Sequence, residues 1–334
     1  MTKITGPELL AAFTKERSKY ATDAACHRAL AVRYDLNADS VRGRLYRERK
    51  KPRREADAKG AAWRAAHKTI TPNPELFRHD LGTPWVLPDA GYIVIGDVQL
   101  VTTRYDFAAL PMAIGKQELP RGKRYCILAG DFVNADAFSG YESDQDETAF
   151  AAEVEAGRAF FDEYLTVFDR IFWLYGNHER RLGKRTKGAI KPLHLLRTMT
   201  WDKRVEVSHW GHCVVENERG HDWRISHARN YSINQLTVAD QLALKYQQNI
   251  IQHHEHHCAK GWDRYGRYIV IDNGGLFDYE QMAYAVIDDS KSAIMKNGFT
   301  LLRRGVSHLF SDDPFTDWEM WLPERRLRVV KRAA

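Results

Sequence analysis

Five apolar runs of the sequence are each followed at once by residues whose side chains bind metal ions or phosphate. The runs are rich in β-branched and aromatic residues, as buried strands are. In chain order, the polar residues that follow them are Asp97, Asp131, Asn177-His178, His227 and the histidine-rich run 253–257. Ligands of open α/β sheets bind at the carboxyl ends of strands. The order therefore predicts an α/β fold that gathers these side chains at one edge.

The most constraining of the five runs is 170–174, which leads into Tyr175-Gly176-Asn177-His178-Glu179. Gly176 is expected to permit a sharp turn that a residue with a Cβ would resist. An amide, an imidazole and a carboxylate are thereby presented together at a strand end. Taken alone, the segment would more simply be a turn with solvated polar residues, and it is the ordered set of five that indicates a site.

The ordered set resembles the calcineurin-like metallophosphoesterase superfamily, whose blocks read D-x-H, G-D-x-x, G-N-H-D/E, H and G-H-x-H. The resemblance covers about residues 91–277, and its most specific elements are Gly130-Asp131, Gly176-Asn177-His178-Glu179 and His254-Glu255-His256. Two positions depart from the pattern, because Gln99 stands where the first block usually has His and His253 where the last block usually has Gly. The resemblance implies a two-sheet α/β sandwich flanked by helices, with metal ions at the strand ends.

A centre of two divalent metal ions is also implied by the resemblance. In it Asp131 would bridge both ions, the first ion would be held by Asp97, Gln99 and His256, and the second by Asn177, His227 and His254. Such a set of oxygen and nitrogen donors suits Mn²⁺, Mg²⁺, Fe²⁺ or Zn²⁺ rather than a thiolate-bound metal, and we favour Mn²⁺.

Gln99 matters most among the departures, since an amide oxygen is a weaker and harder ligand than imidazole. The first site is expected to bind its ion loosely and to prefer Mn²⁺ or Mg²⁺ over Zn²⁺. A centre with one tight ion stays open, and so does a shift of one residue along the run 253–257. His253 and His257 are expected to support the ligands from behind or to be exposed.

The catalytic residues implied by the resemblance are His178, Asp131 and Glu179. His178 would bind no metal and would either hydrogen-bond the phosphate or protonate the leaving oxygen. Glu179 is expected to orient the loop that carries His178. Two adjacent ions can activate a water molecule and clamp a phosphoryl oxygen together. The chain is therefore expected to be a metal-dependent phosphoric ester hydrolase.

The first 70 residues have a different character, being helical in pattern, rich in Lys and Arg, and almost without strand signals. Helices are expected over residues 7–13 and 23–34, and Ser40 or Asp39 can cap a third. This arrangement resembles a helix-turn-helix. The residues expected to contact nucleic acid along and beyond the third helix are Arg42, Arg44, Arg47, Arg49, Lys50 and Lys51. A basic surface helix that docks on a protein is the alternative.

A domain boundary is expected near Pro72 and Pro74, because neither proline donates a backbone hydrogen bond and each restricts the residue before it. The sequence thus predicts a small basic all-α domain over residues 1–70, a linker to about residue 75 and a catalytic domain over residues 76–334. In the catalytic domain Arg180 and Arg181 open a basic stretch, residues 180–187, that follows the proposed site. This stretch is interpreted as a contact to a nucleic-acid backbone or to a substrate phosphate, and an ordinary exposed loop is the alternative.

The overall composition is mildly basic, with a formal net charge of +6. No run approaches the roughly 18 apolar residues that a membrane span needs, and the first residues lack the apolar core of a secretory signal. The four cysteines form no C-x-x-C pair, which argues against disulfides and a zinc ribbon. We therefore expect a cytoplasmic protein with no membrane partner, in the host cytoplasm if a phage encodes it.

Three functions are weighed from these features. The leading one is a phosphodiesterase or nuclease that acts on DNA, guided by the basic helices. A phosphomonoesterase or protein phosphatase is the second, although the Asp-Arg-Gly that protein phosphatases usually place after the second block is absent from Gly130-Asp131-Phe132-Val133-Asn134. The third is a DNA-binding protein whose metal site is weakened by Gln99. The combination of domains is similar to phosphoesterases carried by bacteriophages.

Overall fold

The computed structural model describes residues 4–46, 48, 82–139, 150–281, 295–313 and 316–322. The chain divides into two compact units, residues 1–80 and 81–334. The expected nucleic-acid contacts of Arg47, Arg49, Lys50 and Lys51, and the expected linker at residues 70–74, lie outside the described residues. Within the described ranges, no helix is both long and apolar enough to cross a membrane.

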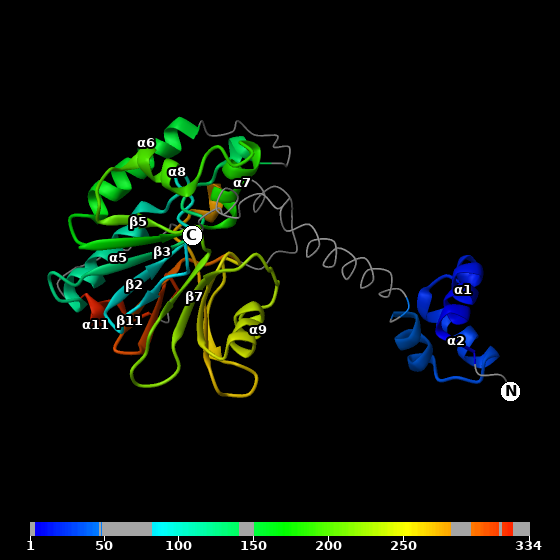
Figure 1. Cartoon of the computed structure of the whole chain (residues 1–334). Helices are drawn as coiled ribbons and strands as arrows, with labels where there is room; N and C mark the ends of the chain where they lie inside the picture. The colour runs from blue at the N-terminus through cyan, green and yellow to red at the C-terminus, as the bar shows by residue number, and fades with distance from the viewer. Residues whose placement is uncertain are drawn as a thin grey trace, which may run out of the picture. The chain divides into compact units, whose positions relative to one another are not determined.

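The first unit consists of helices around a small apolar core (Figure 1). Helix α1 (Gly6–Glu16) begins where Glu8 accepts the Thr5 N–H at 2.8 Å, and α2 (Asp23–Arg33) begins where the Thr22 hydroxyl accepts the Ala25 N–H at 3.2 Å. A third helical segment covers residues 38–46. Its cap is Asn37, whose side chain accepts the Asp39 N–H at 2.8 Å, so the expectation of a Ser40 or Asp39 cap was wrong. The core residues are Leu9, Phe13, Cys26, Leu30, Ala31, Val41 and Leu45.

Two six-stranded mixed sheets form the second unit. One has the order β12-β11-β2-β3-β4-β5, with bounds Val306–Ser311, Gly298–Arg303, Tyr92–Ile95, Tyr125–Ala129, Arg170–Leu174 and Val205–Val207. The other has the order β1-β6-β7-β8-β10-β9, with bounds Val86–Leu87, His212–Val215, Trp223–His227, Asn249–His253, Ile269–Asn273 and Cys258–Trp262. Strands β2 to β5 run parallel to one another, as do β7, β8 and β10.

Helices cover the outer face of each sheet and produce four layers (Figure 1). Helices α5 (Tyr105–Glu118), α6 (Phe150–Tyr164) and α8 (Pro192–Met199) pack on the sheet that contains β2. Helix α9 (Thr237–Tyr246) packs on β8 and β10 of the other sheet. The expected two-sheet α/β sandwich flanked by helices is confirmed.

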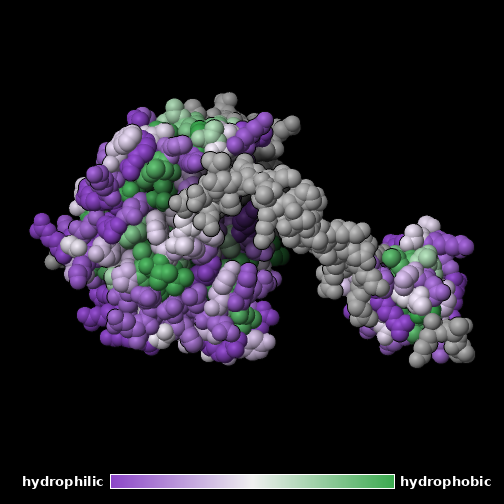
Figure 2. All heavy atoms as spheres, viewed as in Figure 1, coloured by the Kyte–Doolittle hydropathy of each residue, from purple (hydrophilic) through white to green (hydrophobic). Residues whose placement is uncertain are grey.

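Strands β2 and β3 are apolar along their whole length, as is typical of strands with both faces buried. Val94 and Ile127 point into the core between the sheets, whereas Ile93 and Leu128 point into the core beneath the helices. Near the C-terminal end of the described chain, Leu322 belongs to the core beneath the helices, and Trp318 and Trp321 pack against it. On the face shown in Figure 2, hydrophobic residues form small separate groups in a mostly hydrophilic surface.

The parallel register brings the strand ends to one edge of the sandwich. Leu128 of β3 pairs with Ile95 of β2 and with Trp173 of β4, and His227 of β7 pairs with His253 of β8. The loops that follow these strands therefore emerge side by side, as expected from the sequence.

Several elements differ from expectation. Residues 177–185 form a helix, α7 (Asn177–Arg185), so reading the basic stretch as an exposed loop was wrong for most of its length. The sequence patterns did not indicate α5, α8, β9, β11 or β12. Helix α5 contains Pro111, which ordinarily argues against a helix interior.

Candidate metal centre

The backbone of the loops at the strand ends is strained. Five of the seven predicted metal ligands have a positive φ, and these are Asp97 (46°), Gln99 (48°), Asp131 (47°), His254 (94°) and His256 (59°). Residues with a Cβ rarely adopt this conformation, which costs about 1–3 kcal/mol each and is concentrated at functional sites. In this backbone conformation the side chains of consecutive loops point toward a common region.

The first predicted ligand group converges on His256. Its Nε2 lies 3.2 Å from Asp97 Oδ1 and 3.1 Å from the side-chain amide of Gln99. All three side chains are buried. Asp97 Oδ1 and Gln99 Oε1 have no hydrogen-bond partner among the described residues. Gln99 therefore faces the ligand group although it departs from the family pattern.

The second predicted ligand group converges on His227. Ligand atoms of Asp131, His227 and His254 all lie within 4.8 Å of one another. His227 Nε2 is 3.1 Å from Asp131 Oδ2 and 2.9 Å from Asn177 Oδ1. The other ring nitrogen, Nδ1, lies 2.8 Å from the carbonyl oxygen of Ala129. Because a carbonyl can only accept, this contact places a hydrogen on Nδ1 and aims Nε2 at the group.

The seven predicted ligands thus form two adjacent groups, and a pair of divalent ions fits them. Asp97 Oδ1, Gln99 Oε1 and Asp131 Oδ2 are buried and lack hydrogen-bond partners within the described part of the chain. Buried polar atoms normally have a hydrogen-bond partner, so buried carboxylate and amide oxygens without one indicate the place of a positively charged ligand. Oxygen and imidazole donors without a thiolate suit Mn²⁺, Mg²⁺, Fe²⁺ or Zn²⁺.

The charges of the centre shift one another's pKa values. Burial would raise the pKa of Asp131, but His178 and His227 hold it below its ordinary value. Burial would lower the pKa of His227, but Asp131 and Asp97 raise it to about 10. This spot therefore attracts positive charge strongly, and the same field favours a divalent cation.

Glu179 holds together two backbone segments that carry residues of the centre. Its fully buried carboxylate accepts four backbone N–H groups, from Gly176 (2.8 Å), Asp131 (3.1 Å), Phe132 (2.6 Å) and Val133 (3.3 Å). These bonds tie the loop after β3 to the first turn of α7. Burial and the neighbouring Asp131 raise the pKa of Glu179 to about 7.

Two glycines are required by close contacts. A Cβ on Gly176 would lie 2.2 Å from Asp131 Oδ1, and a Cβ on Gly130 would lie 2.7 Å from the His227 ring. Gly176 itself has an ordinary extended backbone, with φ −82°. The expectation that Gly176 serves a sharp turn was therefore wrong, and its lack of a side chain makes room for Asp131.

His178 borders the centre without joining either ligand group. Its Nε2 lies 3.6 Å from Asp131 Oδ2, its backbone N–H donates to Asp131 Oδ1 at 2.9 Å, and its Nδ1 lies 2.8 Å from the Asn134 carbonyl oxygen. The imidazole is thus held between α7 and the loop after β3, at the edge of the centre.

The side chains of the run 253–257 have different surroundings. His254 and His256 belong to the ligand groups, whereas the buried His257 lies 3.6 Å from Asp272, and Glu255 accepts the Ser232 N–H at 2.7 Å. His253 is also buried, and its Nδ1 lies 3.4 Å from Asp97 Oδ2. Neither His253 nor His257 is exposed, which removes that alternative.

The basic residues expected to bind nucleic acid have different surroundings. Arg181 reaches His178, with 3.0 Å between Nη2 and Nε2. Arg180 points elsewhere and donates to the carbonyl oxygen of His209 at 3.1 Å. In the first unit the Arg42 side chain is 72% exposed, whereas Arg44 donates to the Ile4 carbonyl at 3.4 Å. Arg181 therefore lies at the metal centre, and its spacing of three residues from His178 on α7 is the feature of the sequence that indicates this.

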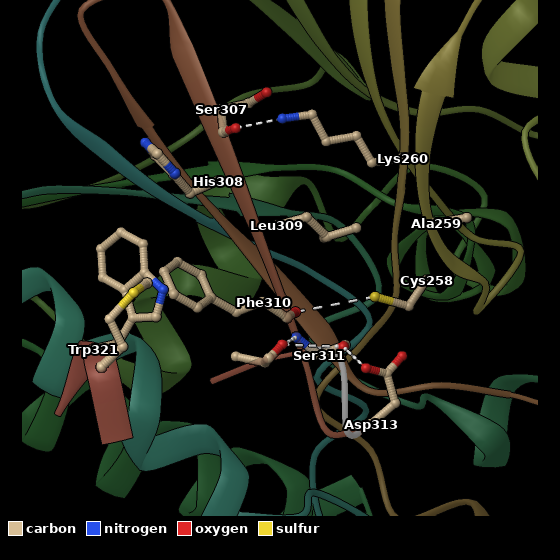
Figure 3. A pocket seen from close by; sticks show the side chains of 12 residues that line it. Cys258, Ala259, Lys260, Ser307, His308, Leu309, Phe310, Ser311, Asp313 and Trp321 are labelled. Carbon is tan, nitrogen blue, oxygen red and sulfur yellow. Dashed lines mark hydrogen bonds between the residues drawn. The ribbon is translucent and has the colours of Figure 1, made fainter. Parts of the chain in front are cut away.

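A separate hollow of about 600 Å³ lies between the edge strands β9 and β12 (Figure 3). Lys260 bridges it by donating to the Ser307 carbonyl oxygen, and Trp321 closes one side. None of the seven predicted ligands lines this hollow. It is therefore not part of the metal centre.

The family profile of calcineurin-like phosphoesterases matches residues 92–324. Among solved structures, the chain is similar to a conserved uncharacterized protein of Streptococcus pneumoniae TIGR4 described as a predicted phosphoesterase, with 13% identity, 66% of this chain and 97% of that chain covered, and a TM-score of 0.29. It is also similar to a cold-active protein-tyrosine phosphatase of a psychrophilic Shewanella species, with 12% identity, coverage of 67% and 83%, and a TM-score of 0.28. None of the curated proteins matches.

Proposed function

The chain belongs to the calcineurin-like phosphoesterase family, and from this premise we propose that it is a metal-dependent phosphodiesterase that cuts DNA. The observation that carries the hydrolase part is the convergence of seven nitrogen and oxygen donors with orphaned buried oxygen atoms at one edge of the sandwich. The DNA part depends on the basic helical unit at the N-terminus.

In this proposal Asp97, Gln99 and His256 would hold one ion, Asn177, His227 and His254 would hold the other, and Asp131 would serve both. The ions supply an activated water and positive charge for the phosphoryl oxygens. The chain supplies the surroundings. Its buried carboxylates would hold the ions, the His178 N–H in the first turn of α7 fixes the carboxylate of Asp131, and the His178 imidazole would contact the phosphate or the leaving oxygen.

DNA is proposed as the substrate because the first unit resembles a helix-turn-helix and exposes Arg42 on its third helical segment. Cationic side chains on a polyanion release counterions, which gives affinity that depends on salt but not on sequence. The basic character of the whole chain, with a net charge of +6, supports the same partner.

A panel of metals and substrates tests the reaction class. The protein is loaded with Mn²⁺, Mg²⁺ or Zn²⁺ and incubated with linear duplex, single-stranded and circular DNA, RNA, bis(4-nitrophenyl) phosphate and 4-nitrophenyl phosphate. Hydrolysis of the diesters and of DNA is expected, and Asp131→Ala should abolish it because the shared ligand is lost. Hydrolysis of the monoester alone would replace the nuclease proposal by a phosphomonoesterase.

Removal of residues 1–74 tests the role of the basic unit. Turnover of bis(4-nitrophenyl) phosphate should survive, since every predicted ligand lies in the second unit. DNA affinity should fall and its dependence on salt should flatten, because fewer counterions are released. Equal affinities and equal salt slopes for the two proteins would assign the basic helices to a protein partner instead.

A further inference from the structure

The guanidinium of Arg181 lies between helix α7 and the turn at residues 134–136. Its Nη1 donates to the Asn134 carbonyl oxygen and to Asp136 Oδ1, both at 3.1 Å, and its Nη2 lies 3.0 Å from His178 Nε2. His178 and Arg181 are three residues apart on α7, so they share one face of the helix. Arg181 therefore stands beside the imidazole that borders the metal centre.

The directions of these hydrogen bonds identify the donor at this place. His178 Nδ1 faces the Asn134 carbonyl oxygen, which only accepts, so the neutral imidazole carries its hydrogen on Nδ1. Nε2 then accepts from Arg181, because a guanidinium only donates. The guanidinium therefore supplies charged N–H donors beside an imidazole nitrogen that lies 3.6 Å from Asp131 Oδ2, an oxygen of the predicted shared carboxylate.

Part of the guanidinium is still available for a ligand. A guanidinium has five N–H donors, and for Nε–H and the second hydrogen of Nη2 no acceptor is found among the described residues. The Arg181 side chain is 24% exposed to solvent. A charged, planar fork that is held on one side and open on the other matches the oxygen atoms of a phosphoryl group.

We propose that Arg181 binds the phosphoryl group of the substrate at this centre, and that Asp136 and Glu153 position it. This inference rests on the proposed phosphoester hydrolysis and adds a catalytic residue to it. Arg181 donates to the non-bridging oxygens of the phosphate, where negative charge gathers during phosphoryl transfer. Its role differs from a contact to distant backbone phosphates of DNA, because it acts on every phosphoester, including the smallest.

The positioning residues form a chain from helix α6 to the guanidinium. Glu153 of α6 is fully buried and accepts the N–H groups of Asn134 at 2.8 Å and of Ala135 at 2.9 Å. Ala135 adopts a left-handed conformation with φ 52°, which the two bonds stabilise. The turn fixed in this way presents the Asn134 carbonyl and the Asp136 carboxylate to Arg181.

The test uses the full-length, Mn²⁺-loaded protein and compares Arg181→Ala, Arg181→Lys and the control Lys184→Ala. Lys184 is an exposed cation of the same helix, so the control loses the same charge. Arg181→Ala should lower kcat/KM for bis(4-nitrophenyl) phosphate by about 10²–10³-fold, the usual effect of removing one donor to the transition state. It should also raise the Kd of inorganic phosphate, measured by calorimetry, at least about tenfold at unchanged metal content.

Two further readouts separate phosphate binding from a structural role. Free guanidinium ion should restore part of the activity of Arg181→Ala and should leave Lys184→Ala unchanged. Arg181→Lys keeps the charge but loses the planar pair of donors, so its kcat/KM and its phosphate affinity should lie between those of the wild type and Arg181→Ala. If Arg181→Ala fails to fold, Arg181→Lys provides the test of phosphate binding. Asp136→Asn should raise KM and the Kd of phosphate without changing metal content.

Two results would overturn the inference. An active wild-type protein whose Arg181 variants match Lys184→Ala in kcat/KM and in phosphate affinity overturns the inference alone. A metal-loaded wild-type protein that hydrolyses no phosphoester overturns the proposed function, and the inference falls with it.

Discussion

Glu179→Gln is the substitution with the most sharply defined energetic consequence. The carboxylate of Glu179 accepts four backbone N–H groups, two on each oxygen, in a site with no exposure. A glutamine amide keeps one oxygen, which can serve two of these donors. Its NH₂ group then faces the other two, whichever way the amide is turned, because the N–H groups of Asp131 and Gly176 meet one oxygen and those of Phe132 and Val133 meet the other.

The expected cost follows from this count. A buried donor left without an acceptor costs about 1–3 kcal/mol, so two of them cost roughly 2–6 kcal/mol. That is a large share of the roughly 5–15 kcal/mol that stabilises a typical protein. The unsatisfied donors lie in the loop that carries Asp131, so metal affinity should fall along with stability.

Urea unfolding of the metal-free protein, followed by tryptophan fluorescence, measures the cost. Trp173 and Trp223 are fully buried in the second unit and report its unfolding. The matched control is Glu163→Gln on the exposed side of α6, which should stay within about 0.5 kcal/mol of the wild type. If Glu179→Gln were as stable as Glu163→Gln, the carboxylate would not be the acceptor that joins the two loops, and the reasoning would be refuted.

Three other predictions follow from the same region. Gln99→His should tighten the first metal site and shift its preference toward Zn²⁺, because imidazole is a borderline donor; an unchanged metal titration would show that Gln99 is not a ligand. His178→Ala should keep both ions, since it removes no predicted ligand, and should lower kcat by about 10²–10⁴-fold; loss of metal would contradict its placement outside the ligand groups. Burial raises the pKa of Glu153 to about 7 from an ordinary 4.5, so its stabilising effect is complete below pH 4.5 and about 3 kcal/mol is lost as the pH rises through 7. In Glu153→Gln this loss should disappear from urea unfolding curves recorded between pH 4.5 and 8, and identical pH dependence in both proteins would contradict the shift.

The strand ends could be predicted from the sequence because burial on both faces leaves a simple signal. Runs such as Tyr125–Ala129 are apolar throughout, and the first polar residue after each run marks the loop. The choice of the seven ligands among the polar residues at these strand ends came from the resemblance to the metallophosphoesterases.

Helix α7 could not be predicted in the same way, because five of its nine residues are charged and only Glu179 and Leu182 are buried. Its start is set by Glu179 and its neighbours in the loop after β3, which are distant in sequence. Strand β9 could not be predicted for a different reason. It is an edge strand of Cys-Ala-Lys-Gly-Trp with no buried residue, so it carries neither alternation nor an apolar run.

The two residues that depart from the family pattern, Gln99 and His253, both belong to the surroundings of the Asp97 carboxylate. Asp97 Oδ1 contacts His256, whose Nε2 also contacts Gln99, and Asp97 Oδ2 lies 3.4 Å from His253. Space for the His253 ring exists because residue 96 is glycine, where a Cβ would lie 2.4 Å from Nδ1. In the sequence the two changes are separated by more than 150 residues and look like independent losses. In the fold they are linked, since the weaker donor at Gln99 is accompanied by an added imidazole that restrains the carboxylate of the same ligand group.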